Sequence, residues 1–296
     1  DKNACAGVKL FLGSSTGNML VDNEEVIEKI FSNTELVISA HCEDETTIKN
    51  NLEKYKAEFG DAIPIKYHPI IRSEEACYLS SSRAIELAKK TNARLHVFHV
   101  STAKETNLFR NDIPLEEKRI TAEVCTHHLW FSDADYDEKG TFIKWNPAVK
   151  TAADRDGLWE ALLDDRIDVL ATDHAPHTLA EKQNIYTNAP SGGPLVQHTL
   201  SALLEKVKEG KISLEKLVQK MCHNPAILFN IEKRGYIKEG YFADLVLVDR
   251  NSSWTVTKNN ILYKCGWSPF EGTSFSAQVT HTFVNGNLAY QNGKIS

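Results

Sequence analysis

The decapeptide Asp168-Val-Leu-Ala-Thr-Asp-His-Ala-Pro-His177 decides the fold of this chain, because an apolar run there ends in a group of polar side chains. The run predicts a buried strand, and Asp173, His174 and His177 follow at its carboxyl end. In parallel (β/α)8 barrels, catalytic groups gather at the carboxyl ends of the strands. An Asp-His pair there can bind a metal or transfer protons, whereas the alternative is a turn in which Asp173 caps the next helix.

Strand-like and helix-like runs alternate before and around this decapeptide. The predicted strands are residues 7–12, 35–40, 94–100, 119–125 and 168–172, and the predicted helices are residues 24–32, 43–59, 74–91, 104–110 and 152–164. Such alternation, with Val, Ile and Leu in the strands, is typical of a parallel α/β fold with helices outside. A full barrel has eight strands in about 250 residues, so we expect three further units, about 90 residues, before Asp1.

The periodicity of the apolar residues changes near residue 235. Residues 194–209 and 213–229 predict two amphipathic helices, the second of which contains Asn224-Pro225. Beyond them, apolar and polar residues alternate, and Asn285-Gly286 is typical of a hairpin turn. We therefore expect a partial barrel at residues 1–235, holding strands four to eight, and a small β domain at residues 236–296.

Composition narrows the classes of function. The chain has 296 residues, 42% of them hydrophobic, and a net charge of −6, with no dense basic run for nucleic acid. It lacks a run of about 18 apolar residues, so a cytoplasmic protein with a small-molecule substrate and no membrane partner is expected. The cysteines lie far apart and predict reduced, buried thiols.

Potential metal ligands stand at the ends of predicted strands. His41 ends one strand, His99 ends the next, and Asp173 ends the last. Two imidazoles and a carboxylate suit Zn²⁺, which binds nitrogen and oxygen at about 2.0–2.2 Å. His96 lies an odd number of positions from His99, so only one of the two can face the barrel interior, and His96 is predicted to be a core residue.

Lys9 interrupts an otherwise apolar strand. Burial of its amine should lower the pKa and favour the neutral form, which can take up CO₂. The resulting carbamate is an anionic oxygen ligand that can bridge two metals. The alternative is a lysine whose side chain extends outward to water.

Successive motifs of the chain resemble those of dihydroorotases in the amidohydrolase superfamily, in order and over essentially the whole length. They are Lys9-Leu-Phe-Leu-Gly, Ala40-His-Cys-Glu-Asp44, His96-Val-Phe-His-Val-Ser-Thr102, Glu123-Val-Cys-Thr-His-His-Leu129, Trp145-Asn-Pro-Ala-Val-Lys-Thr151 and Ala171-Thr-Asp-His-Ala-Pro-His177. The segment from Gly235 to Asp249 is similar to the C-terminal sandwich of the superfamily.

The resemblance implies a hydrolase with two zinc ions that interconverts N-carbamoyl-L-aspartate and L-dihydroorotate in pyrimidine biosynthesis. It makes Lys9 a carbamylated bridging ligand, His41 and His99 ligands of one zinc, and Asp173 a ligand of the other and the general base. Asn146 and His177 would hold the substrate carboxylate, and the loop with Pro190, Gly192 and Gly193 would contact the substrate ring. His127 and His128 are expected to be structural, His68 to pack a loop, and His174 not to bind metal. A homodimer is also implied.

The chain departs from the family pattern in one respect. In dihydroorotases the first strand of the barrel normally carries His-x-His-x-Arg. That motif supplies two zinc ligands and an arginine, and nothing in this sequence replaces it. We therefore expect the motif on a preceding segment and do not expect this chain alone to be active. Two alternatives stay open: a dihydropyrimidinase, hydantoinase or allantoinase, and a catalytically inactive dihydroorotase-like subunit.

Overall fold

The computed structural model describes residues 5–13, 20, 21 and 23–296 of the chain. It divides the chain into two compact units, Asp1–Gly193 and Pro194–Ser296. The sequence predicted a domain boundary between residues 235 and 236, which lies inside the second of these units, at the point where its helices end and its strands follow. The helical segment from residue 194 to residue 235 groups with the strands that follow it. Over the described residues, no helix is both long and apolar enough to span a bilayer.

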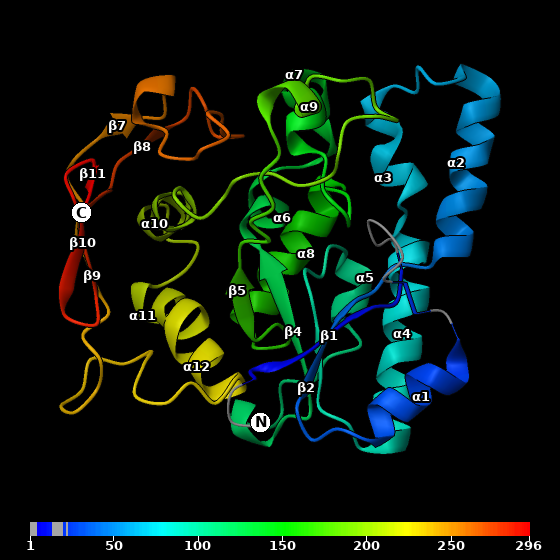
Figure 1. Ribbon diagram of the computed structural model, residues 1–296, viewed down its shortest axis with the longest axis horizontal. Coiled ribbons are helices and arrows are strands. Elements are labelled where there is room, and N and C mark those ends of the chain that lie inside the picture. Colours follow the sequence, from blue (N-terminus) through cyan, green and yellow to red (C-terminus); the bar gives the residue numbers. More distant parts are fainter. Residues whose placement is uncertain (1–4, 14–19, 22) are drawn as a thin grey trace. The chain divides into compact units, whose positions relative to one another are not determined.

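The first unit is built on a parallel five-stranded sheet, which confirms the predicted α/β class (Figure 1). Neighbouring strands follow the order of the sequence, as expected for successive β/α units of a barrel. Phe11 lies opposite His41 in the register, and Cys125 lies opposite Ala171. The strands are β1 (Gly7–Phe11), β2 (Val37–His41), β3 (Leu95–Val97), β4 (Ile120–Cys125) and β5 (Val169–Ala171).

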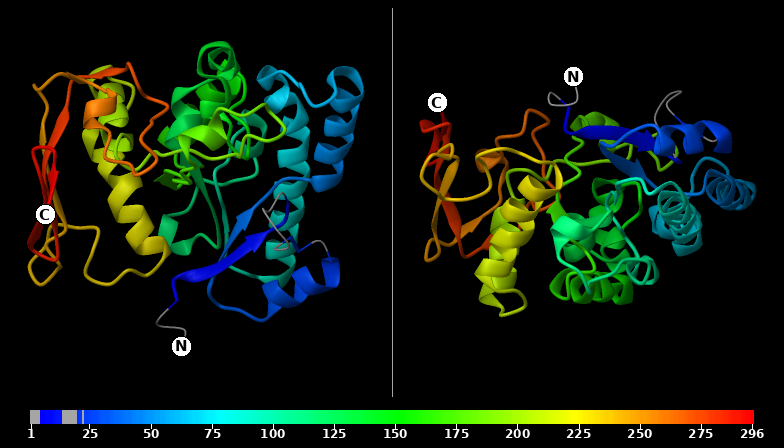
Figure 2. Two further views of the ribbon diagram at one scale, coloured as in Figure 1. Left: turned by 45° about the horizontal axis from the view of Figure 1, so that its top comes forward. Right: turned by 90° about the horizontal axis from the view of Figure 1, so that it is seen from below.

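Helices connect the strands, and α4 contacts β3 while α6 contacts β4 (Figure 2). The α-helices are α1 (Glu24–Ser32), α2 (Glu45–Phe59), α3 (His68–Ile71), α4 (Glu74–Thr91), α5 (Ala103–Thr106), α6 (Thr126–Trp130), α7 (Tyr136–Lys139), α8 (Ala152–Leu163) and α9 (Leu179–Lys182). Shorter 3₁₀ turns are η2 (Ile65–Tyr67), η3 (Leu115–Glu117), η4 (Asp133–Asp135) and η5 (Gly140–Ile143). Of the five helices predicted in this unit, those at α1, α2, α4 and α8 are confirmed to within two residues at each end. The helix predicted at residues 104–110 was wrong at its end, because α5 ends at Thr106.

Side-chain caps explain where these helices begin. Asn23, Asp44 and Ser73 each accept a hydrogen bond from the third backbone N–H that follows. The cap at Asp44 starts α2 two residues later than predicted and leaves residues 42–44 extended. Glu43 therefore lies on the extended connection that leaves β2.

The second unit begins with helical segments, α10 (Thr199–Lys208), α11 (Leu214–Val218), η6 (Gln219–His223) and α12 (Asn224–Leu228). The prediction of a helix from residue 194 was wrong at its start, because α10 begins at Thr199. The predicted single helix at 213–229 is also broken in the middle by the π-helical turn η6. Pro225 explains the break, since it has no N–H to continue the α-helical ladder.

Antiparallel strands complete the second unit. β9 (Gln278–Val284) and β10 (Asn287–Gln291) form the predicted hairpin, and Asn285 and Gly286 both have positive φ, as a type I′ turn requires. The four-stranded sheet has the order β11-β10-β9-β6, with β6 at Leu245–Asp249 and β11 at Lys294–Ile295. A two-stranded sheet joins β7 (Trp254–Thr255) to β8 (Ser274–Phe275), and the 3₁₀ turn η7 (Lys258–Asn260) lies between them in sequence.

Candidate active site

Polar side chains gather at the carboxyl edge of the parallel sheet. His41 is the last residue of β2, and His99 and Asp173 each follow their strand by two residues. Both His99, at φ 38°, and Asp173, at φ 45°, adopt left-handed backbone conformations that cost most residues about 1 kcal/mol or more. The predicted alternation between His96 and His99 does not apply, because β3 ends at Val97 and His99 lies beyond the strand.

His41 and His99 face each other through ring nitrogens. His41 Nδ1 lies 3.1 Å from His99 Nε2, and both residues are buried. The other nitrogen of His41, Nε2, lies 2.8 Å from the Glu43 carboxylate, which accepts a hydrogen bond from its N–H. That contact leaves the lone pair of His41 on Nδ1, on the side of His99.

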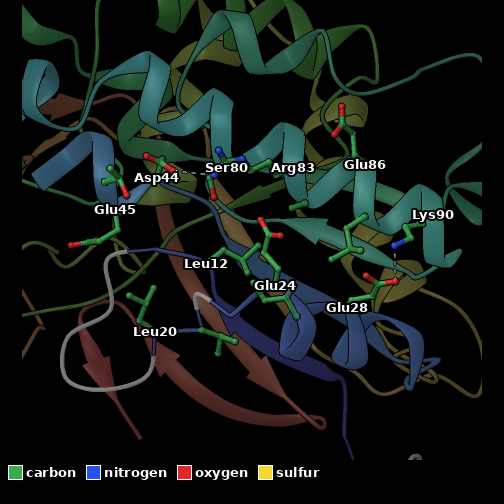
Figure 3. Close-up of a pocket in the computed structure, with 15 residues that line it drawn as sticks. Leu12, Leu20, Glu24, Glu28, Asp44, Glu45, Ser80, Arg83, Glu86 and Lys90 are labelled. Carbon is green, nitrogen blue, oxygen red and sulfur yellow. Dashed lines mark hydrogen bonds and ion pairs between the residues drawn. The ribbon is translucent and has the colours of Figure 1, made fainter. Parts of the chain in front are cut away.

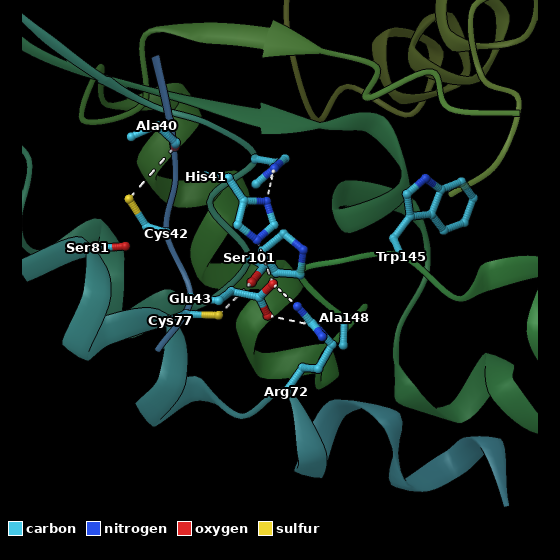
Figure 4. Close-up of polar contacts among 12 residues, drawn as sticks. Ala40, His41, Cys42, Glu43, Arg72, Cys77, Ser81, Ser101, Trp145 and Ala148 are labelled. Carbon is cyan, nitrogen blue, oxygen red and sulfur yellow. Dashed lines mark hydrogen bonds and ion pairs between the residues drawn. The ribbon is translucent and has the colours of Figure 1, made fainter. Parts of the chain in front are cut away.

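Glu43 is completely buried and also accepts two hydrogen bonds from Arg72 (Figure 4). Arg72 Nε lies 3.0 Å from Oε1, and its terminal Nη2 lies 2.6 Å from Oε2. Burial alone would raise the pKa of Glu43, but Arg72 and His41 hold that pKa well below its usual range. Glu43 is therefore a permanent anion that fixes the ring orientation of His41.

The two imidazoles fit a zinc ion. With Zn–N bonds of about 2.0–2.1 Å, two ligands of a tetrahedral ion lie about 3.3 Å apart, close to the separation of the two histidine nitrogens. Burial, reinforced by His41 and Lys9, lowers the pKa of His99 well below its usual value and keeps the ring neutral. Among the described residues, however, no group of three or more His, Cys, Asp or Glu side chains is arranged to hold a metal.

Asp173 and Lys9 influence one another electrostatically at the same edge. Burial and the neighbouring Glu123 raise the pKa of Asp173 to about 6, whereas His41 and Lys9 act in the opposite direction. Burial lowers the pKa of Lys9, opposed by Asp173 and Glu123. A carboxyl group with a pKa near neutrality is suited to accept and return a proton.

The sequence predicted a buried amine for Lys9, but the residue is exposed in the structure. It lies on β1, an edge strand of the described sheet, with its ammonium 4.0 Å from the centre of the Phe98 ring and 4.8 Å from that of Phe11. Aromatic faces on both sides replace part of its water shell. The amine is thus partly desolvated without being enclosed.

His96 is a buried core residue, as the sequence predicted. Its Nδ1 lies 2.9 Å from the Thr121 hydroxyl, and its Nε2 lies 3.1 Å from Glu123 on β4. The second oxygen of Glu123 accepts a hydrogen bond from the backbone N–H of His99 at 3.3 Å. Glu123 therefore links the core histidine to the main chain that carries the candidate ligand.

The predicted substrate residues lie on two connections. The Oδ1 atom of Asn146 is buried and has no hydrogen-bond partner among the described residues. His177 Nε2 lies 3.1 Å from the carbonyl oxygen of Ser191, which brings the end of the decapeptide against the loop that holds Pro190, Gly192 and Gly193. A hydrogen bond from Ala175 N to Gly193 O, at 3.2 Å, makes a second connection.

The other histidines of the motifs have structural surroundings. The His127 ring stacks on Trp145 at 4.3 Å, and His128 Nε2 donates to Pro147 O at 3.1 Å. His68 is buried between Tyr186 and Trp145 O, while His174 is exposed. Of the cysteines, all free, Cys42, Cys77 and Cys125 are buried with raised pKa values; Cys5 and Cys222 are exposed, so the prediction of buried thiols was wrong for both.

A separate pocket of about 490 Å³ lies between α1, the start of α2 and α4 (Figure 3). Its described lining combines apolar side chains such as Leu12 and Ile27 with Glu24, Glu28 and the exposed Arg83. The lining includes none of the predicted site residues, which leaves the carboxyl edge of the sheet as the candidate active site.

Comparison with known proteins agrees with the fold and with the motifs. The model of the amidohydrolase family matches residues 19–289. The chain belongs to the amidohydrolase family. It is 34% identical over 299 residues to a dihydroorotase of Halobacterium salinarum, covering 100% of this chain and 67% of the relative. It is 33% identical over 287 residues to a dihydroorotase of Pyrococcus furiosus, covering 97% of this chain and 62% of the relative.

Solved structures of related amidohydrolases share the fold. L-Hydantoinase (dihydropyrimidinase) from Arthrobacter aurescens superposes with a TM-score of 0.90 at 27% identity, covering 98% of this chain and 66% of that structure. Dihydropyrimidinase from Brevibacillus agri superposes with a TM-score of 0.87 at 23% identity, covering 99% and 65%. The chain thus spans about two-thirds of the length of these amidohydrolases.

Sequence reasoning missed the residues that support the histidines. Glu43 and Glu123 stood inside the quoted motifs and Arg72 stood outside them, but no role was predicted for any of the three. Glu43, two residues after a candidate ligand, was the one available signal, because a metal-bound histidine commonly donates its second N–H to a carboxylate. The pairing with Arg72 depends on packing between distant segments and has no local signature.

Proposed function

We propose that this protein is a dihydroorotase, a zinc-dependent enzyme that interconverts N-carbamoyl-L-aspartate and L-dihydroorotate in pyrimidine biosynthesis. The observation that carries the proposal is the 3.1 Å pair of His41 Nδ1 and His99 Nε2 at the carboxyl edge of the sheet. The dihydroorotase motifs and the dihydroorotases at 33–34% identity support the choice of reaction within the family.

Different residues of the chain would have different roles at the proposed metal centre. His41 and His99 would bind one zinc ion through these two nitrogens, and Asp173 would bind the second. Lys9, as a carbamate formed when its neutral amine attacks CO₂ and releases a proton, would bridge the two ions. Bound zinc would polarise the ring carbonyl and acidify water. Asp173, with a pKa raised to about 6, would carry the proton between that water and the ring nitrogen.

Asn146, His177 and the loop of Pro190, Gly192 and Gly193 would hold the substrate. Hydrogen bonds from Asn146 and His177 suit a carboxylate, and a glycine-rich loop allows close approach of a ring to the main chain. His177 already lies 3.1 Å from Ser191 O, so one hydrogen bond joins the two parts of the substrate region. We also propose that the protein forms a homodimer and acts in the cytoplasm.

An assay with matched substrates tests the proposed reaction. The full-length protein, loaded with zinc, should convert dihydroorotate and carbamoyl-aspartate into one another. Hydantoin and dihydrouracil are the controls, because the hydantoinase fold neighbours make a hydantoinase the rival enzyme. Hydrolysis of hydantoin without turnover of dihydroorotate would reject our assignment in favour of that rival.

Metal analysis separates an enzyme from an inactive family member. About two zinc ions per subunit are expected for the proposed centre. His41→Ala and His99→Ala should each lower the zinc content, whereas His174→Ala, which changes an exposed histidine next to Asp173, should not. A native fold that binds no zinc would instead support a scaffolding subunit.

A further inference from the structure

Two lysines beside the proposed substrate region are buried and bind main-chain oxygens. Lys182 is 0% exposed and donates to the carbonyl oxygens of Pro190 at 2.9 Å, Gly192 at 2.8 Å and Lys144 at 3.3 Å. Lys144 is 8% exposed and donates to the carbonyl oxygens of Tyr186 at 2.7 Å and Ala189 at 2.5 Å. Two ammonium groups thus converge on one short loop.

Hydrogen bonds to its main-chain carbonyl oxygens therefore hold the loop from residue 186 to residue 193 in place. The carbonyls of residues 189 to 193 each meet a donor from outside the loop: Lys144 for Ala189, Lys182 for Pro190 and Gly192, His177 for Ser191, and Ala175 N for Gly193. Two of these donors, Ala175 and His177, belong to the end of the decapeptide at residues 168–177, just after β5. The loop and the strand end form one hydrogen-bonded unit, which ties the loop to the neighbourhood of Asp173.

Burying this pair of cations is unfavourable. Burial, reinforced by the nearby Lys144, lowers the pKa of Lys182 to about 7, and burial also lowers the pKa of Lys144, to about 8. A loop that needed only stability could be held by neutral donors at lower desolvation cost. The three carbonyl oxygens around Lys182 Nζ need three N–H donors, which only the ammonium form supplies. Charge-assisted hydrogen bonds of this kind are shorter and more restrictive in geometry than those of neutral donors.

We propose that Lys182 and Lys144 are positioning residues, which hold the main chain of residues 189–193 against the β5 strand end so that the loop can bind the substrate ring. The kinetic part of this inference rests on the proposed dihydroorotase function. The structural part, that the two lysines immobilise the loop, is independent of the reaction.

Lys182→Met in the full-length, zinc-loaded protein tests both parts. Loss of three charge-assisted hydrogen bonds should speed amide hydrogen exchange of residues 186–193 about tenfold or more. The KM for dihydroorotate should rise by about tenfold or more while kcat changes less, since binding is weakened without altering the reacting groups. Lys182→Arg, which keeps the charge and the donors, should restore part of both losses.

Lys118→Met is the matched control. Lys118 is also buried, and its ammonium binds Asp165 O and Asp168 Oδ1, both at 2.6 Å, at the amino end of β5. Its replacement should lower the unfolding free energy without changing either the exchange of residues 186–193 or KM. Lys144→Met, which removes the bonds to Tyr186 and Ala189, serves if Lys182→Met does not fold.

The outcomes separate the two parts. If exchange in the loop and KM of Lys182→Met equal those of Lys118→Met, the positioning role is overturned. If amide exchange of residues 186–193 is faster but KM is unchanged, the role in substrate binding is overturned and the structural role stands. If the wild-type protein turns over neither substrate, the proposed function fails, and the exchange experiment still decides whether the lysines hold the loop.

Discussion

Removal of the Arg72 guanidinium should destabilise the fold strongly, because it leaves a buried anion without its cation. Glu43 is 0% exposed and Arg72 is 8% exposed, and two hydrogen bonds of 3.0 and 2.6 Å join them. Arg72→Met keeps much of the side-chain volume and removes both donors. Among the described residues, His41 Nε2 is then the hydrogen-bond partner that remains for the Glu43 carboxylate.

The expected magnitude follows from the burial of both groups. Breaking a buried ion pair by removing one partner costs about 3–5 kcal/mol, since the other charge stays desolvated. Two charge-assisted hydrogen bonds at about 1.5–3 kcal/mol each lead to a similar figure. We therefore expect Arg72→Met to lower the free energy of unfolding by about 3–5 kcal/mol.

An exposed pair of the same geometry provides the control. Arg110 donates two hydrogen bonds of 2.6 Å to Asp112, but the two side chains are 59% and 64% exposed. Arg110→Met should cost far less stability than Arg72→Met, because water replaces the lost partner. Urea-induced unfolding of both variants, followed by circular dichroism, measures the difference.

The double variant Glu43→Gln/Arg72→Met distinguishes a buried charge from a loss of packing. The amide oxygen that replaces the carboxylate would still accept a hydrogen bond from His41 but carries no charge, so the double variant should be more stable than Arg72→Met alone. Zinc affinity, measured by competition with a chelator, should fall about 10–100-fold in Glu43→Leu, which cannot orient His41. The reasoning is refuted if Arg72→Met unfolds within about 1 kcal/mol of wild type, or if Glu43→Leu binds zinc normally.

Three further changes test other parts of the structure. Burial holds the pKa of His68 well below its usual value of 6.5, so as the pH falls below 6.5 the unfolded state takes up this proton before the folded state does. Wild type should therefore lose stability more steeply with falling pH than His68→Gln, and equal slopes in urea titrations would contradict this. Gly157→Ala would favour helix α8 by about 1 kcal/mol, but the new Cβ would lie 2.5 Å from Ala103 Cβ, so a net loss of about 1–2 kcal/mol on thermal unfolding is expected, and a gain would be inconsistent. Gly192→Ala, at φ 125° with its Cβ 2.5 Å from Ala175 O, should cost about 2 kcal/mol or more in the same assay, and an unchanged midpoint would argue against the close approach.

The sequence predicted the parallel sheet well, because each of its strands is an apolar run set between helical segments. The ends of the elements were less predictable. Asp44 delays the start of α2, and Pro225 divides the helical segment at residues 213–229. Both effects depend on single residues acting on the main chain, which the apolar periodicity of the surrounding sequence does not reveal.

The candidate site was predictable where its residues follow strands. His41 and His99 were placed together by topology alone, since the ends of neighbouring parallel strands meet at one edge. The burial of Glu43 against Arg72, and of Lys182 against the carbonyl oxygens of a loop, could not be predicted. These contacts join residues 29 apart and 8 to 38 apart in sequence, and only the folded main chain brings them together.

Several departures from the ordinary rules of folding lie at or beside this edge. His99 and Asp173 adopt left-handed backbone conformations, Glu43 is a fully buried anion, and Lys182 is a fully buried cation. Each feature lowers stability unless its neighbours compensate, and the compensating groups are the hydrogen-bonding partners described above. Buried charges also occur away from this edge, as in the ion pair of Lys118 and Asp168 at the amino end of β5, so burial of a charge does not by itself mark a functional position. At the carboxyl edge these features coincide with His99 and Asp173, which would act on metal and substrate, and with groups that hold His41 and the loop of residues 189–193. Departures from the ordinary rules that meet at one site in this way indicate positions fixed for chemistry.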